Sequence, residues 1–441
     1  MLDGREVSYG DMEAGAGRLA ALLQAKGIAP GDRIAVQTAK SPEAVMLYLA
    51  ALKVGAVLLP LNTAYTPAEI DYFVTDAEPA LFVTDAVALA AEAASLAPLD
   101  HEAAPDDLAA ILYTSGTTGR SKGALLTHAA LAANGQALTD AWGFTAGDVL
   151  LHALPIYHVH GLFIALHCVF LSSSTVLWLP KFDEAEVLAA MRQSSVMMGV
   201  PTFYTRLLAN PNFTREAAES IRLFICGSAP LLPSTFADFE QRIGQPILER
   251  YGMSEAAIIT TNPLQGDRIA GSVGYPLPGV DLRIADDGIV QIKGPSVTRG
   301  YWRKPEKTAE AFTADGYFIT GDIGRLDDNG RLWLSGRSSD LIISGGLNVY
   351  PKEIELVLDE MAGVVESAVI GCPHPDFGEA VVAVVAGEGD EAAMIAQTRT
   401  QLAVFKCPKR VFFVADLPRN TMGKVLKAEL RRTYADVFRA E

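Results

Sequence analysis

The sequence has neither an excess of positive charge nor a paired-cysteine pattern. Lysine and arginine number 36 against 52 aspartate and glutamate residues, which gives a net charge of −16. Nucleic-acid phosphates require clustered lysine and arginine, so this balance argues against a nonspecific nucleic-acid partner. The four cysteines are far apart and show no CxxC spacing, which favours reduced, buried thiols over a disulfide framework.

A long apolar run is also lacking. The most apolar stretches are Ala44–Leu61, which lysine, glycine and proline interrupt, and Gly161–Leu171. Both fall short of the roughly 20 apolar residues that a membrane span needs. The polar start at Met1–Glu6 is unlike a secretory signal. We therefore expect a cytoplasmic protein without a membrane partner.

The 441 residues are too many for one core of ordinary size, so the length predicts more than one domain. Helical and extended patterns alternate up to about residue 270, which is typical of mostly parallel sheets covered by helices. Short strands and glycine turns follow at about 271–336 and predict a β-rich subdomain. Residues 337–441 have the pattern of a small α+β unit. The predicted fold class is therefore α/β.

The most distinctive local signal is a run of hydroxyl and glycine residues that follows an apolar strand. It consists of Thr114, Ser115, Gly116, Thr117, Thr118 and Gly119, with Lys122 close behind. Glycines let backbone N–H groups converge on an anion, hydroxyls add donors, and a lysine suits a polyphosphate. No Gly-Lys-Ser/Thr closes the run, so it is not a Walker A loop. From composition alone, a solvated turn explains it equally well.

A second glycine pattern, Gly15–Ala20, matches the dinucleotide motif GxGxxA. It lies inside a helical pattern, and no strand leads into it. The motif needs a strand before it, so we interpret these glycines as part of an ordinary helix.

The hydroxyl and glycine run resembles the signature of the adenylate-forming superfamily, which includes acyl-CoA synthetases, luciferases and peptide-synthetase adenylation domains. Six further blocks resemble that superfamily in the expected order: Leu154–His158, Gly227–Pro230, Tyr251–Glu255, Thr320–Asp322, Gly336–Asp340 and Pro418–Lys424. Within the superfamily the chain is most similar to malonyl-CoA synthetases. The segments that carry this similarity are His152–His158, Gly199–Leu208, Leu248–Met253 and Phe377–Glu379.

The resemblance implies a large N-terminal domain at 1–336, a small mobile domain at 337–441 and an active site between them. It further implies ATP, Mg²⁺ and coenzyme A as ligands. Lys424 and His158 match the family's catalytic residues, and Glu255 matches its magnesium ligand. The ATP-binding residues implied by the match are the hydroxyl and glycine run, Lys122, Gly227, Ser228, Ala229, Pro230, Tyr251, Gly252, Met253, Ser254, Asp322 and Arg337.

Substrate and rotation residues follow from the same resemblance. Arg206 is expected to begin a helix beside the pocket and to hold the distal carboxylate of a dicarboxylate, with Ser228 and His158 nearby. Ser339 matches the hinge between the domains. The loop expected to face coenzyme A is Ser344, Gly345, Gly346 and Leu347.

The resulting hypothesis is an ATP-dependent ligase that joins malonate, and by extension methylmalonate, to coenzyme A through an acyl-adenylate, with release of AMP and pyrophosphate. Two alternatives stay open: a ligase for short- or medium-chain monocarboxylates, and a noncatalytic nucleotide-binding protein of the same fold.

Overall fold

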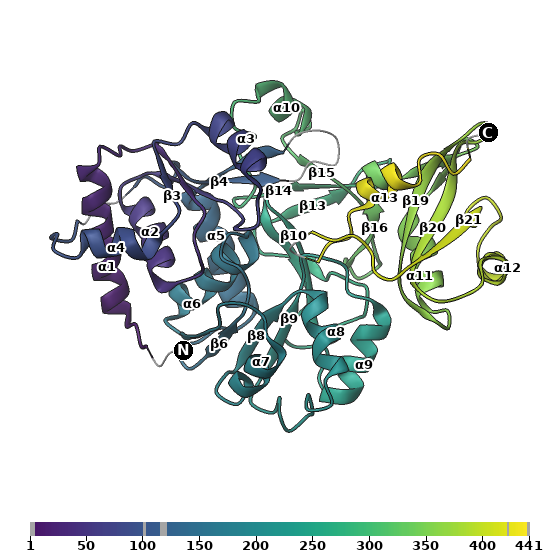
Figure 1. Cartoon of the computed structure of the whole chain (residues 1–441), viewed down its shortest axis with the longest axis horizontal. Coiled ribbons are helices and arrows are strands. Elements are labelled where there is room, and N and C mark those ends of the chain that lie inside the picture. Colours follow the sequence, from purple (N-terminus) through teal and green to yellow (C-terminus); the bar gives the residue numbers. More distant parts are fainter. Residues whose placement is uncertain (1–4, 100–102, 115–120, 421–422, 439–441) are drawn as a thin grey trace.

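The computed structural model describes residues 5–99, 103–114, 121–420 and 423–438. Its strands form four sheets, and helices cover the first two (Figure 1). The first two sheets build the N-terminal half of the molecule, whereas the last sheet lies at the opposite end in a separate group of strands and helices. Within the described part of the chain, no helix is both long and apolar enough to cross a membrane.

The first sheet has the strand order β3-β1-β2-β4-β5, with β5 antiparallel to β4 and the other pairs parallel. Its elements are α1 (Tyr9–Ala25), β1 (Arg33–Val36), α2 (Pro42–Lys53), β2 (Val57–Pro60), α3 (Pro67–Ala77), β3 (Leu81–Val83), α4 (Ala86–Ala93), β4 (Leu108–Thr114) and β5 (Lys122–Thr127). Successive strand residues alternate between two cores, because side chains on a strand point to opposite faces. Ile34 and Leu58 pack with the face that α1, α2 and α4 cover, whereas Ala35 and Leu59 pack against α3.

The helix starts in this region follow from local chemistry. The Ser8 side chain accepts a hydrogen bond from the Asp11 backbone, and the Asp11 carboxylate accepts one from the Ser8 backbone, so α1 begins with a capping box. Thr66 and Glu69 repeat this arrangement at α3. Serine, threonine and proline at these positions therefore fix where the helices begin.

The two glycines of the GxGxxA pattern lie inside α1, as predicted. A Cβ on Gly15 would stand 2.4 Å from the sulfur of Met46, and one on Gly17 would stand 2.7 Å from Pro98. These glycines allow close packing of α1 against its neighbours. They do not form a nucleotide loop.

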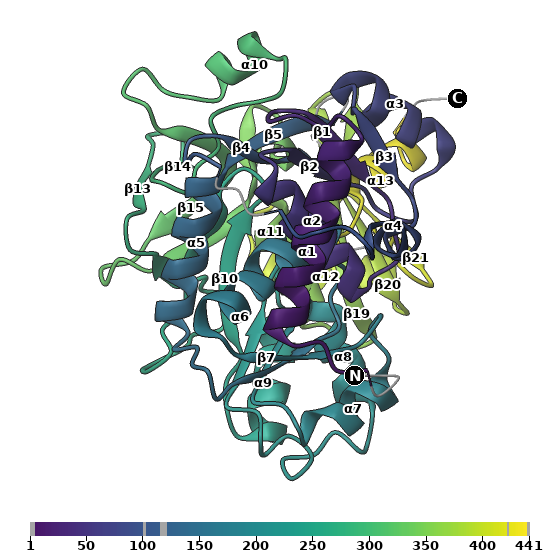
Figure 2. The same cartoon turned by 90° about the vertical axis from the view of Figure 1, so that its left-hand side faces the viewer.

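The second sheet has the order β12-β11-β10-β9-β8-β6-β7, and β10 to β7 along this order are parallel. Its strands are β6 (Val149–His152), β7 (Thr175–Trp178), β8 (Val196–Gly199), β9 (Leu223–Cys226), β10 (Leu248–Met253), β11 (Ala257–Thr261) and β12 (Tyr275–Pro276). One face packs on α5 (His128–Ala141), a π-helical turn η1 (His160–Ala165) and α6 (Leu166–Ser172). The other face packs on α7 (Glu184–Met191), α8 (Pro201–Ala209) and α9 (Pro233–Ile243), as Figure 2 also shows from the side.

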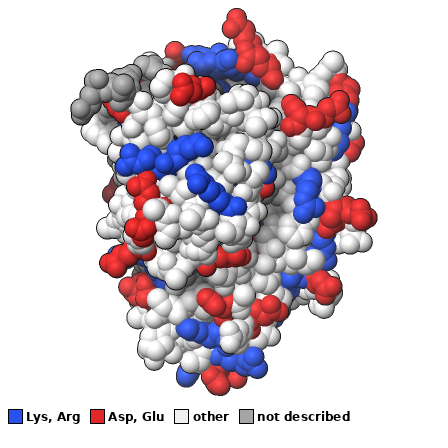
Figure 3. Space-filling model, turned by 90° about the vertical axis from the view of Figure 1, so that its right-hand side faces the viewer, with Lys and Arg blue, Asp and Glu red and all other residues white. Residues whose placement is uncertain are grey.

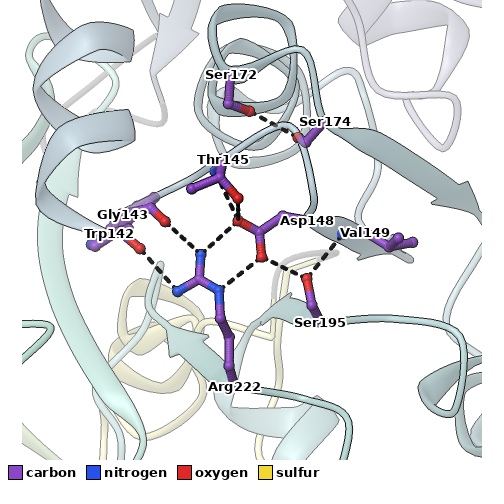
Figure 4. Close-up of polar contacts among 9 residues, drawn as sticks. All are labelled: Trp142, Gly143, Thr145, Asp148, Val149, Ser172, Ser174, Ser195 and Arg222. Atoms are coloured by element: carbon purple, nitrogen blue, oxygen red, sulfur yellow. Dashed lines mark hydrogen bonds and ion pairs between the residues drawn. The ribbon is translucent and has the colours of Figure 1, made fainter.

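A partly buried ion pair, Asp148–Arg222, joins the residue before β6 to the residue before β9 (Figure 4). Asp148 accepts bonds from Arg222 Nε at 2.7 Å, Ser195 Oγ at 2.7 Å and the Thr145 backbone at 2.8 Å. The other guanidinium donors reach the backbone carbonyls of residues 142–143. Burial alone would raise the pKa of Asp148, but the bonds from Arg222 and Ser195 outweigh it and lower that pKa to about 2.

The third sheet is antiparallel, in the order β13-β14-β15-β16, and the fourth has the order β18-β17-β20-β19 with β21 parallel to β20. Their elements are β13 (Asp281–Ile284), β14 (Ile289–Lys293), α10 (Pro305–Glu310), β15 (Phe318–Leu326), β16 (Leu332–Arg337), the 3₁₀ turn η2 (Ser338–Asp340), β17 (Ile342–Ser344), β18 (Leu347–Val349), α11 (Pro351–Asp359), β19 (Val364–His374), β20 (Gly378–Gly387), α12 (Glu391–Gln401), β21 (Arg410–Val414) and α13 (Lys427–Thr433). The predicted α/β class is confirmed. The boundary predicted at 336/337 stays a prediction, and Arg337 itself completes β16.

Candidate active site

A cleft of about 1250 Å³ lies where the N-terminal sheets, the third sheet and the loop before α13 meet. Residues from blocks that are far apart in sequence line this cleft together. Those predicted site residues are Thr114, Lys122, His158, Ser228, Gly252, Met253, Ser254, Glu255, Arg337, Ser339 and Lys424.

The phosphate side of the cleft is formed by the hairpin of β4 and β5. Thr114 and Lys122 are paired across it, so the two ends of the hydroxyl and glycine run are held side by side. The Tyr72 hydroxyl donates to the Ser121 carbonyl at 2.7 Å and fixes the second end to α3. Ser115, Gly116, Thr117, Thr118 and Gly119 lie outside the described residues.

Glu255 lies in the turn between β10 and β11 and is 6% exposed. The Tyr301 hydroxyl donates to its carboxylate at 3.1 Å, and the Lys122 ammonium lies 4.4 Å from the Tyr301 ring centre. Burial raises the pKa of Glu255, while Arg337 and Lys122 oppose that rise. No cluster of three metal-ligating side chains occurs among the described residues. A single carboxylate that faces a phosphate site nevertheless fits Mg²⁺, which one or two carboxylates and phosphate oxygens usually hold.

Asp322 and Arg337 face each other on β15 and β16 and form an ion pair at 2.8 Å. The Tyr251 hydroxyl donates to the same carboxylate at 2.5 Å. Burial alone would lower the pKa of Arg337, but Asp322, followed by Tyr251 and Glu255, raises it. Arg337 lines the cleft with its guanidinium N–H donors, and Asp322 is its counter-ion on the neighbouring strand.

Gly252 holds the neighbouring turn together. A Cβ at this position would lie 2.0 Å from the carbonyl oxygen of Ala257, so the backbones of β10 and β11 touch here. Tyr251 before it and Glu255 after it consequently lie in one compact turn.

The loop that carries Lys424 closes the cleft from the C-terminal side. The Lys424 backbone N–H donates to Asn420 Oδ1 at 3.0 Å, and the Asn420 backbone N–H donates to the Lys424 carbonyl at 2.9 Å. A Cβ on Gly423 would stand 3.1 Å from the Thr202 side chain, so this loop touches the start of α8. Desolvation, followed by the charge of Arg337, lowers the pKa of Lys424. Lys424 lines the same cleft as Thr114 and Lys122, and its meeting with the phosphate hairpin around a nucleotide stays a prediction.

The end of the cleft near His158, where the resemblance leads us to expect the acyl group and which we call the acyl end, contains a buried cation that the sequence did not single out. Arg250, on β10, is 5% exposed, and its Nε and Nη2 atoms have no hydrogen-bond partner within the described residues. His158 Nδ1 and His160 Nε2 are unpartnered in the same way, and Ser228 Oγ lies 3.2 Å from His160 Nδ1. Burial and Arg250 lower the pKa of His158 to about 4, so this imidazole is neutral at pH 7. A buried guanidinium with unpaired N–H donors forms a site for an anion.

A signal for Arg250 did exist in the sequence. Leu248–Met253 reads as a strand that leads into the Tyr251 block, yet Glu249 and Arg250 interrupt its apolar run. Charged residues are rarely buried without a partner or a function. The sequence does not decide whether Glu249 or Arg250 faces the site, because that depends on tertiary contacts.

The loop Gly227–Pro230 follows β9, as predicted, and Ser228 adopts a positive φ of 74° there. A Cβ on Gly227 would lie 2.5 Å from the Arg250 guanidinium carbon. Glycine therefore lets this loop lie directly over the buried cation.

Arg206 differs from these residues. We expected it to begin a helix beside the pocket, but Pro201 begins α8 and Arg206 lies in its last turn. The reason is that proline is preferred in the first helical position. Arg206 is exposed and lies outside the set of residues that line the cleft.

The hinge and the coenzyme A loop lie on the C-terminal side. Ser339 belongs to the turn η2 and lines the cleft. Ser344–Leu347 forms the tight hairpin between β17 and β18, with Gly345 and Gly346 at positive φ, and lies outside the cleft lining. Figure 3 shows basic and acidic side chains intermixed on the C-terminal face, so this face presents no broad field of one sign.

Comparison with known proteins agrees with this arrangement. Residues 1–302 match the family model of the AMP-binding enzymes, and residues 353–424 match that of the AMP-binding enzyme C-terminal domain. The chain therefore belongs to the AMP-binding enzyme family, and the fold and the family together define an AMP-forming acid–thiol ligase.

Individual relatives narrow the position within the family. A malonate–CoA ligase of Arabidopsis thaliana is 34% identical over 98% of this chain and 85% of its own length. A feruloyl-CoA synthase of Amycolatopsis sp is also 34% identical, over 98% of this chain and 94% of its own length. The crystal structure of ATP-bound MatB from Rhodopseudomonas palustris superposes with a TM-score of 0.95 at 49% identity, covering 99% of this chain and 95% of that one.

Proposed function

We propose that this ligase activates malonate, with methylmalonate as a further substrate, and transfers the acyl group to coenzyme A. In the first step a carboxylate oxygen attacks the α-phosphorus of ATP, and pyrophosphate leaves. In the second step the thiol sulfur attacks the acyl carbon, and AMP leaves. The observation that carries the proposal is the cleft that brings Lys122, Glu255 and Lys424 together beside the unpaired Arg250.

Negative charge shifts among the phosphate oxygens during the first step. Fixed cations aimed at those oxygens lower the barrier, because they need little reorganisation. Lys122 and Lys424 approach the cleft from opposite sides and are suited to this role. Glu255 would hold Mg²⁺, which would neutralise charge on the phosphates. Asp322 and Arg337 are suited to bind ribose hydroxyls, and Gly227–Pro230 the adenine side.

Arg250 supports the choice of a dicarboxylate. The distal carboxylate of malonate stays ionised at neutral pH, and its burial without a partner would cost several kcal/mol. The free Nε and Nη2 of Arg250 form one edge of a guanidinium, which can donate two parallel hydrogen bonds to a carboxylate. Ser228 Oγ adds a donor at the same end of the cleft.

Arg206 remains a second candidate for the same carboxylate. It lies four residues after Thr202 on α8, and residues with this spacing share one face of a helix. The Thr202 side chain contacts the Lys424 loop. Arg206 therefore shares a face of α8 with a residue that lies against the Lys424 loop, and its exposure to solvent would weaken its interaction with an anion.

The second step would follow a rotation about Ser339. Such a rotation would withdraw Lys424 from the phosphates and bring Ser344–Leu347 towards the thiol. The glycines of that hairpin would leave room for a narrow arm to pass.

A panel of carboxylic acids tests the proposal. Purified protein is incubated with ATP, Mg²⁺, coenzyme A and one acid at a time, and the thioester is identified by its mass. We expect malonate to give the highest kcat/KM and methylmalonate the next. A preference for acetate or butyrate would replace malonate by a monocarboxylate, and absence of pyrophosphate release with every acid would indicate a noncatalytic protein.

A further inference from the structure

A buried lysine far from the catalytic blocks contacts the strand that leads into the acyl end of the cleft. Lys40 lies in the loop between β1 and α2, and its ammonium has three partners. They are the His152 carbonyl at 2.8 Å, the Leu179 carbonyl at 2.6 Å and His152 Nδ1 at 2.8 Å. Three acceptors match the three N–H donors of an ammonium.

His152 connects this lysine to the site. Its side chain is 1% exposed, and its Nε2 lies 2.9 Å from the Gly161 carbonyl. A Cβ on Gly161 would stand 2.1 Å from the Pro155 carbonyl oxygen, so the chain folds back tightly between residues 152 and 161. His158 lies within this folded segment.

The contacts determine the protonation of the pair. The Gly161 carbonyl can only accept, so Nε2 of His152 must carry a hydrogen. With one hydrogen on a neutral ring, Nδ1 accepts, and Lys40 must supply the third donor as an ammonium. The Trp178 ring stacks on His152 at 5.1 Å, and its centre lies 4.4 Å from the Lys40 nitrogen, which also favours the cation.

The charge of Lys40 is otherwise uncompensated. Burial lowers the pKa of Lys40 well below its usual range, and no carboxylate of the described chain opposes that shift. A lysine held in this way costs stability unless each donor is satisfied. Its three short bonds meet that condition: two end on His152, on the approach to His158, and the third ends on Leu179, directly after β7.

We infer that Lys40 and His152 are positioning residues for the acid-activation step, because together they hold the 152–161 segment so that His158 faces the acyl end of the cleft. The inference rests on the proposed function only in that an acid is activated there. Neither residue lines the cleft, so neither touches the substrate.

Two substitutions of His152 separate a role in positioning His158 from a role in stability alone. In His152→Gln the amide nitrogen can replace Nε2 and keep the bond to Gly161, while the acceptor for Lys40 is lost. In His152→Asn the amide oxygen can replace Nδ1 and keep Lys40 satisfied, while the bond to Gly161 is lost. We expect Asn to lower activity more and Gln to lower stability more.

The assay is ATP–pyrophosphate exchange with the acid that the unmodified protein activates best. A displacement of about 1 Å in a reacting group can cost about a hundredfold in rate, so we expect His152→Asn and Lys40→Met to lower kcat/KM for the acid by at least about tenfold. The KM for ATP should stay within about twofold. Lys26→Met, which removes an exposed lysine paired with Glu92, serves as the matched control and should change neither value.

Several results would overturn the inference. They are a normal kcat/KM in Lys40→Met and His152→Asn, an equal loss in His152→Gln and His152→Asn, or a parallel loss of ATP binding. The nitrogen chemical shifts of His152 give a readout independent of activity, with Nε2 protonated and Nδ1 not. If no acid is activated by the unmodified protein, the proposed function fails, while these shifts still decide whether the pair exists.

Discussion

Two arginines of the second sheet, Arg222 and Arg250, differ in how their charge is balanced. Arg222 is about a third exposed, and each of its nitrogen atoms donates a hydrogen bond, with Asp148 as its counter-ion (Figure 4). Arg250 is more deeply buried, yet two of its nitrogens lack a partner within the described chain. The first arginine joins segments of the fold, whereas the second faces open space in the cleft.

The difference shows at which arginine the fold carries the energetic penalty of an unpaired charge. Burial of an unpaired charge costs several kcal/mol, and a well-packed protein avoids it unless a ligand completes the pairing. Burial lowers the pKa of Arg250 to about 10, so the guanidinium is still charged at pH 7. We therefore expect Arg222 to contribute mainly to stability and Arg250 mainly to affinity for an anion.

The largest effect is expected at a cation that acts directly on the phosphates. Lys424→Ala should lower the rate of pyrophosphate release by about 10²–10³-fold, because removal of one donor to a charged transition state typically has that cost. Stopped assays of pyrophosphate formation would measure it. Binding of ATP should survive, and a normal rate would contradict the role of Lys424.

Arg250→Met tests the unbalanced arginine itself. We expect kcat/KM for malonate to fall about a hundredfold or more, because the distal carboxylate loses a bidentate, charge-assisted partner. The free energy of unfolding should stay the same or rise, because the variant removes a buried unpaired charge. A loss of stability without a loss of malonate activity would mean that Arg250 stabilises the fold and does not bind the acid.

Arg222→Met is the matched change at the balanced arginine. It should leave kcat/KM within about threefold and lower the free energy of unfolding by about 2–3 kcal/mol, because Asp148 is left buried without its counter-ion. Chemical denaturation measures the change. Equal effects of the two methionine variants on malonate activation would mean that the two arginines do not differ in role.

A fall in pH tests how much the Asp148–Arg222 pair contributes to stability. The pKa of Asp148 is about 2 in the folded protein and near 3.9 in an unfolded chain, so the carboxylate stabilises the fold above about pH 4. That contribution, about 1–2 kcal/mol after allowance for the exposed part of Arg222, is lost as the pH falls from about 4 to about 2. Unfolding curves of the protein and of Asp148→Asn should therefore converge in acid.

The smallest effect is expected at Arg206. Arg206→Ala should lower kcat/KM for malonate by no more than about tenfold, because an exposed guanidinium interacts weakly with an anion. The measurement is the same acid-dependent exchange assay. A loss as large as that in Arg250→Met would make Arg206 an equal partner of the carboxylate.

Much of the fold could be predicted because its signals are local. Ser8, Ser41 and Thr66 cap the starts of α1, α2 and α3 through contacts within a few residues, and the alternation of apolar residues in the strands matches two cores. The catalytic blocks could be recognised because each is a short continuous segment. The start of α8 was misjudged because Pro201 was not weighed as the first helical residue.

The role of Arg250 could not be predicted in this way. Its significance is that it lacks a partner, and the absence of a partner is a property of the whole fold. Lys40 and His152, which are separated by 112 positions in sequence, are a similar case, because no local pattern links the two residues.

The contact at Gly252 limits how the enzyme can be redesigned. With β10 and β11 touching there, any larger residue would displace the turn that carries Glu255. Val159 also lines the cleft, and it is not a glycine held against another backbone. Anyone who wishes to make the ligase accept bulkier acids should vary position 159 and keep position 252 unchanged.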